Sequence, residues 1–62
     1  MSSDVSIDED LQAQLSDDGW EHYDSLEDAF KQLYRDLYMK EGTYKTVDAI
    51  ERAAVIKRIL EG

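Results

Sequence analysis

His22 is the only histidine in this 62-residue chain, and the chain contains no cysteine. Nucleophilic catalysis needs a base held beside a positioned nucleophile, whereas His22 stands among aromatic and acidic residues, where we expect a surface or interface role. Carboxylates are abundant, but a chain this short cannot easily build the water-excluded cleft that shifts their pKa values for acid–base catalysis. We therefore expect a non-enzymatic protein with no catalytic residue.

The oxygen-rich runs at 8–10 and 17–19 raise the question of calcium binding. An EF-hand loop needs acids at its positions 1, 3 and 5, glycine at 6 and glutamate at 12, and no window of this sequence has that spacing. The glycines Gly19, Gly42 and Gly62 are far apart and form no phosphate-cradling pattern. We expect no metal and no cofactor.

Acidic residues are concentrated in the first half of the chain. Residues 1–30 contain ten Asp and Glu without any Lys or Arg, whereas residues 31–62 contain seven bases and five acids, and the whole chain carries a net charge of −8. Such a field repels phosphates, so we expect no direct nucleic-acid or membrane partner. Acids that only aided solvation would be spread over the surface, so their clustering favours a basic partner protein.

The length allows one small domain, 1–62, which we divide into an acidic arm at 1–24 and a helical hairpin at 25–62. No stretch approaches the roughly 18 apolar residues of a membrane span, and no secretory leader pattern is present. We expect a cytoplasmic protein. Because so small a core has no disulfide to support it, we also expect a homodimer.

The first helix of the predicted hairpin spans about 26–41, with Ser25 as its N-cap and Gly42 at its end. One face repeats at helical spacing, and we expect Leu33 at its buried centre. The apolar positions of this face are Leu26, Ala29, Phe30, Leu33, Tyr34, Leu37 and Tyr38.

A second helix is predicted at about 47–61, after a connector at 42–46 in which Thr46 serves as the N-cap. Its apolar stripe is broad enough to need two neighbours, namely the first helix and either a third element or a second copy of the chain. The stripe consists of Ala49, Ile50, Ala53, Ile56, Ile59 and Leu60, and Val47, Ala54 and Val55 widen it beyond what one partner helix covers.

A short helix is predicted at about 7–16, with Ser6 and Glu9 as a capping box and Ile7, Leu11 and Leu15 on one face. We expect a turn at 17–19 and an extended connector at 20–23. An alternative pairs 20–23 with 43–47 as a two-stranded ribbon. Another alternative is that residues 5–10 form an extended motif that adds a strand to a ubiquitin-like modifier.

A short stretch of the chain contains Leu33, Tyr34, Lys40, Glu41, Tyr44 and Lys45. This stretch resembles the small, dimeric, helical phycobilisome-degradation adaptors of cyanobacteria. Gly42 and the Ala- and Ile-rich end do not follow that family, so the resemblance implies a helical adaptor and nothing more specific.

The fold class expected from these patterns is all-α. The function that fits the charge is an adaptor or inhibitor that presents its acidic half to a basic protein, in the sharpest case as a DNA mimic of the phage type that blocks a host nucleic-acid-binding protein. The alternative is a small helical transcription regulator or dimerisation module that acts through its apolar and aromatic stripe. The expected partner-binding residues are Asp8, Glu9, Asp10, Asp17, Asp18, Trp20, Glu21, Asp24, Tyr34 and Tyr38.

Overall fold

The computed structural model describes the backbone of residues 3–62 and the side chains from Val5 onward. This part of the chain contains no strand, so the all-α prediction is confirmed and the ribbon between 20–23 and 43–47 is wrong. Within it, no helix is both long and apolar enough to cross a membrane. The helices are α1 (Ser3–Gln14), α2 (Asp17–Asp24), α3 (Asp28–Glu41) and α4 (Thr43–Glu61).

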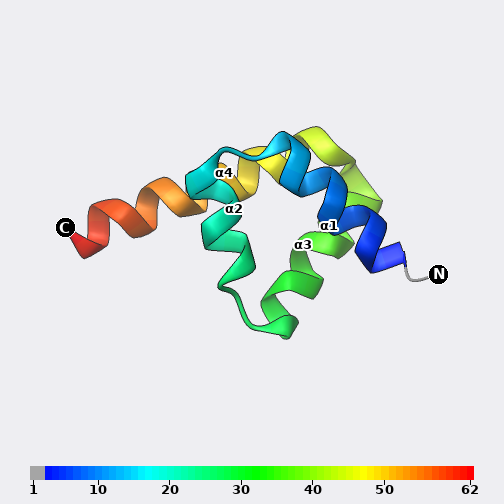
Figure 1. Ribbon diagram of the computed structural model, residues 1–62, viewed down its shortest axis with the longest axis horizontal. Helices are drawn as coiled ribbons and strands as arrows, with labels where there is room; N and C mark the ends of the chain where they lie inside the picture. The colour runs from blue at the N-terminus through cyan, green and yellow to red at the C-terminus, as the bar shows by residue number, and fades with distance from the viewer. Residues whose placement is uncertain (1–2) are drawn as a thin grey trace.

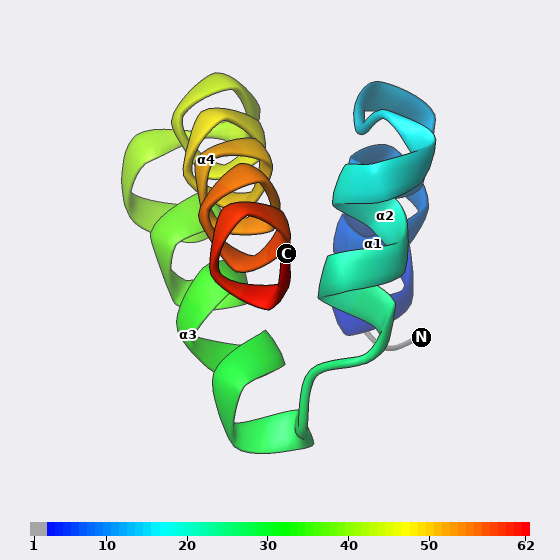
Figure 2. The same cartoon turned by 90° about the vertical axis from the view of Figure 1, so that its left-hand side faces the viewer.

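Helix α4 is the element around which the others are arranged, and it contacts each of them. The molecule is 39 Å long, and the start of α1 and the end of α4 lie at opposite ends of this axis (Figure 1). Viewed from the end of α4, α1 and α2 lie on one side of that helix and α3 lies on the other (Figure 2). The C-terminal part of α4 extends beyond the rest of the molecule (Figure 1).

The core consists of the α1 face Ile7, Leu11 and Leu15 packed against Tyr23 and Ile50. The side chains of Leu11 and Ile50 are completely buried. The prediction that Ile7, Leu11 and Leu15 lie on one face of the helix at about 7–16 is therefore confirmed, and this face is buried. Partly buried hydrophobic residues surround this cluster: Trp20, Leu26, Tyr34, Tyr38 and Val47.

The predicted turn at 17–19 and extended connector at 20–23 are wrong, because this segment is helix α2. Ser16 is its N-cap, and the Ser16 hydroxyl accepts a hydrogen bond from the Gly19 amide (3.1 Å). Asp17 and Asp18 in the first turn stabilise the helix, because their negative charges interact favourably with the positive end of its dipole. The capping box at Ser6 is also wrong, since Ser6 lies inside α1. The extended motif at 5–10 fails for the same reason.

The connection between α3 and α4 is shorter than the predicted connector at 42–46, because Gly42 alone separates the two helices. Gly42 has a φ of 89°, which favours glycine, so its predicted role at the helix end is confirmed. Thr46 is not an N-cap. It is buried inside α4, where its hydroxyl donates to the Gly42 carbonyl (3.0 Å). Ser25 instead ends α2, and α3 begins after Glu27.

The prediction that Leu33 lies at a buried centre is wrong, because 63% of its surface is exposed. Phe30 is also half exposed, whereas Tyr34 and Tyr38 pack against the core. In α4 the buried residues are Thr46, Ile50 and Ala54, and the predicted stripe members Ile56, Ile59 and Leu60 are exposed. Short neighbouring helices cover only one side of α3 and α4, so helical spacing overstated the buried faces.

Candidate functional site

Helix α2 is fixed to α4 by a polar contact at its start. The Ser16 hydroxyl donates to the Glu51 carboxylate of α4 (2.8 Å) while it caps α2. Gly19 is buried at this crossing, and a methyl group at this position would overlap the Glu51 carboxylate. Glycine therefore permits the close approach of the two helices, and the opposite side of α2 is left to face the solvent.

The solvent side of α2 carries an array of carboxylates. Asp17, Glu21 and Asp24 are exposed and follow i, i+4, i+7 spacing, so they share one face of the helix. With Asp18, the eight residues of α2 hold four carboxylates over about 10 Å of helix axis. This linear charge density is similar to that of one B-DNA strand, which has one phosphate per about 3.4 Å.

Two of these four carboxylates form an ion pair with a basic side chain. Asp18 accepts a hydrogen bond from Arg58 of α4 (2.8 Å), and Asp24 lies 4.0 Å from the Lys31 amine. Among the described residues, Asp17, Glu21 and the exposed Glu9 of α1 form no ion pair. The uncompensated negative charge is therefore greatest at Asp17 and Glu21.

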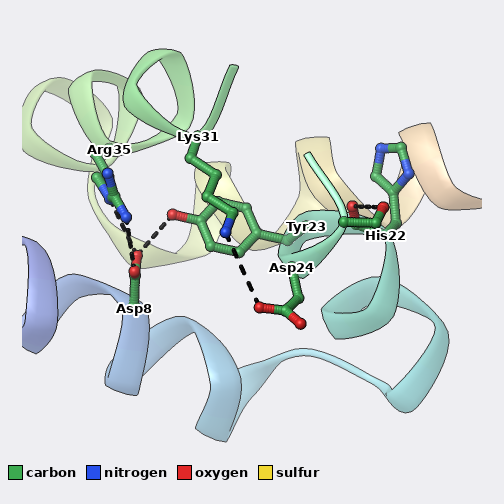
Figure 3. A network of polar contacts seen from close by, with 7 residues as sticks. Asp8, His22, Tyr23, Asp24, Lys31 and Arg35 are labelled. Carbon is green, nitrogen blue, oxygen red and sulfur yellow. Dashed lines mark hydrogen bonds and ion pairs between the residues drawn. The ribbon is translucent and has the colours of Figure 1, made fainter. Parts of the chain in front are cut away.

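Asp8 lies at the meeting point of three helices and is not a free surface acid. Arg35 of α3 binds it with both a Nε contact (3.2 Å) and a Nη2 contact (2.8 Å), and the Tyr23 hydroxyl of α2 donates to it (2.6 Å). Figure 3 shows Arg35 and Tyr23 approaching Asp8 of α1 from different sides. Asp8 therefore ties α1 to both α2 and α3.

The network determines the ionisation of its members. Burial alone would raise the pKa of Asp8, but the hydrogen bonds from Arg35 and Tyr23, together with the Arg35 charge, lower the pKa below its ordinary value of 3.8. Burial and the bond to Asp8 raise the pKa of Tyr23, so its hydroxyl remains a proton donor. The folded state thus favours a charged Asp8.

Asp10 forms the second polar connection of α1. Its carboxylate accepts hydrogen bonds from the Tyr38 hydroxyl of α3 (2.7 Å) and the Thr43 hydroxyl of α4 (2.8 Å). These two bonds lower the pKa of Asp10. Asp8 and Asp10, both expected at the partner-binding surface, are therefore engaged in holding α1 on the other helices.

We expect acid to remove the stabilisation that Asp8 supplies. Because its pKa is lower in the folded state than the unfolded value of 3.8, this contribution is complete above that value and is lost as the pH falls through the folded pKa. Thermal unfolding of the wild type and of Asp8→Asn, followed by circular dichroism, should differ most at neutral pH and converge as the pH falls below the folded pKa of Asp8. A difference that is independent of pH would contradict the assignment.

The three aromatic residues of the expected site have mainly internal contacts. Trp20 and Tyr34 both pack against the buried Tyr23 ring. The ring of Trp20 is tilted, with its centre 5.7 Å away, and the ring of Tyr34 lies edge-on, with its centre 6.1 Å away. Tyr38 donates its hydroxyl to Asp10. These rings are only partly exposed, so a partner can reach their edges but not bury them whole.

A shallow cleft of about 190 Å³ lies between α2 and the end of α4. His22 lines this cleft, and its buried Nδ1 atom has no hydrogen-bond partner among the described residues. No local sequence pattern indicates this cleft, because its two walls come from the separate segments 18–25 and 54–61. Its lining residues are Asp18, Glu21, His22, Ser25, Ala54, Lys57, Arg58 and Glu61.

The described residues show no metal-binding cluster, and comparison with known proteins identifies no relative. From Val5 onward, where side chains are described, no three histidine, aspartate or glutamate side chains gather closely enough to hold a metal ion. No family model, curated protein or solved structure shows a significant match to this chain. The site is therefore defined by its own geometry. Glu9 of α1 is exposed, and the exposed carboxylates of α2 are Asp17, Asp18, Glu21 and Asp24, which we call the acidic surface.

Proposed function

We propose that this protein is a non-enzymatic adaptor or inhibitor that binds a basic surface of another protein through its acidic surface. In its sharpest form it is a DNA mimic that occupies the phosphate-binding site of a nucleic-acid-binding protein, as a phage-type inhibitor of a host protein would. We also propose that α3 and α4 form a helical hairpin, that the protein is cytoplasmic and that it has no catalytic activity.

The observation that supports the proposal most strongly is the solvent face of α2. Its carboxylates stand at helical spacing, and Asp17 and Glu21 form no ion pair with a described residue, although Glu21 lines the cleft that also holds Lys57 and Arg58. An unpaired acid on a rigid helix keeps its full charge for an incoming cation, and such charges steer association with basic surfaces. The bonds that fix α2 on α4 hold this array in place before a partner arrives.

The proposal can be tested with two variants of equal net charge. We expect Asp17→Asn combined with Glu21→Gln to reduce the capture of basic proteins from a bacterial lysate, because the uncompensated part of the array is removed. The control combines Asp36→Asn and Glu41→Gln, which remove two exposed acids of α3. Captured proteins are identified by mass spectrometry after washes at low salt and at about 0.5 M salt.

The control variant should capture the same proteins as the wild type, and the high-salt wash should release them. Equal losses in both variants would show that net charge alone matters and would contradict a defined surface. A basic partner that stays bound at high salt would contradict electrostatic docking.

The second candidate function is a regulator or dimerisation module that acts through apolar side chains. The observation in its favour is the group of exposed aliphatic residues near the end of α4. This function uses a different surface from the acidic one, so the two can be tested separately.

A further inference from the structure

The C-terminal part of α4 exposes a group of large aliphatic side chains. Val55, Ile56, Ile59 and Leu60 are 52–81% exposed, and we call them the outer face of α4. No described residue after Ala54 is buried. This part of the helix is also the part that extends beyond the rest of the molecule (Figure 1).

The outer face is distinct from the side of α4 that packs in the core. At about 100° per residue, positions 56 and 59 project from the side of the helix opposite to positions 50 and 54. The core side is covered by α2, whose Asp18 reaches Arg58 across it. Val55 borders α2 in a pocket that Ser16 and Asp18 also line. An open hollow of about 420 Å³ lies beside Val55 and Ile56.

The charge distribution indicates what can cover this face. Two copies of a chain with a net charge of −8 repel one another wherever their acidic halves meet. Helices α3 and α4 are the exceptions, because α3 has three bases and three acids and the four bases of α4 slightly outnumber its three acids. Contact through the projecting end of α4 also keeps the start of each α1 helix away from the contact, because the start of α1 and the end of α4 lie at opposite ends of the 39 Å axis (Figure 1).

We propose that the outer face of α4 binds the same face of a second copy, related by a two-fold axis. A two-fold contact brings like patches together, and of the surfaces discussed here the outer face combines large aliphatic side chains with balanced charge. The patch is only two to three helical turns long, so the dimer buries less than the roughly 800 Å² per partner of a standard interface. The association is accordingly weak and reversible.

This inference rests on the second candidate function and does not depend on the acidic surface. Sedimentation equilibrium of the full chain between about 10 and 500 µM should show a monomer–dimer equilibrium. Ile59→Asp should weaken it at least about tenfold, because a carboxylate would be desolvated in the contact. The matched control is Leu33→Asp on α3, which is similarly exposed and adds the same charge.

The control should dimerise like the wild type, and circular dichroism should show the same helix content in all three proteins. A wild type that stays monomeric up to about 500 µM would overturn the proposal. Equal dimerisation of all three proteins would also overturn it, as would equal losses in both variants. Dimerisation should persist at about 0.5 M salt, where capture by the acidic surface is lost, so failure of either proposal is recognised separately.

Discussion

Leu11→Ala is expected to unfold most of the protein at room temperature. Leu11 is completely buried at the centre of the α1 face, between residues of the core cluster. Replacing a buried leucine by alanine removes apolar contacts and leaves a cavity, which together cost about 2–5 kcal/mol. A single core in a chain this small supplies only about 3–5 kcal/mol of stability, so little would remain.

The control for this substitution is Leu33→Ala, which makes the same chemical change at an exposed position. We expect its free energy of unfolding to stay within about 0.5 kcal/mol of the wild-type value. Urea denaturation followed by circular dichroism measures both variants. A larger loss for Leu33→Ala than for Leu11→Ala would contradict the packing described above.

Asp8→Ala is expected to be the most damaging loss of a charged residue. It removes the two contacts to Arg35 and takes the acceptor from the Tyr23 hydroxyl, on a residue that is only 1% exposed. Hydrogen bonds to charged groups contribute about 1.5–3 kcal/mol, so we expect a loss of about 2–3 kcal/mol in the free energy of unfolding. Urea denaturation at neutral pH gives this value directly.

The neighbouring Glu9→Ala serves as the control. Glu9 lies in the same helix and carries the same charge, but it is exposed and forms no ion pair within the described part of the chain. Its loss should leave the denaturation midpoint almost unchanged. If both variants lost the same stability, the effect would come from the α1 helix or from net charge and not from the network at Asp8.

The sequence predicted the helices that have a regular apolar face. The i, i+4, i+8 spacing of Ile7, Leu11 and Leu15 located both α1 and its buried side, and Gly42 correctly marked the end of α3. These signals are local, because side-chain spacing and glycine conformation depend only on neighbouring residues. They could not show how much of each apolar face another helix covers, as Leu33 demonstrates.

Helix α2 was missed because its first residues have two physical meanings. A run of Ser16, two aspartates and Gly19 is typical of a turn, yet the same residues provide an N-cap and favourable charges for the first turn of a helix. Packing of α2 on α4 favours the helix over the turn, and it includes the hydrogen bond from Ser16 to Glu51, which lies 35 residues away. No local pattern contains that information.

The composition of the sequence predicted an acidic site, but it could not predict which acids are exposed and which are bound to other helices. An excess of acids in the first half indicated a basic partner, and Asp17 and Glu21 of α2 are exposed and form no ion pair with a described residue. Asp8 and Asp10 looked equivalent to these acids in the sequence, but their partners Arg35, Tyr38 and Thr43 lie on other helices. Such long-range pairs could not be recognised before the fold was known.

The association rate of a captured basic partner tests the central claim most directly. We would measure it by stopped-flow fluorescence for the wild type, the Asp17→Asn/Glu21→Gln variant and the charge-matched Asp36→Asn/Glu41→Gln variant, at about 50 and 500 mM salt. The account predicts slower association at low salt for the first variant only, and a difference that disappears at high salt. Equal rates for all three proteins at both salt concentrations would contradict binding through the acidic surface.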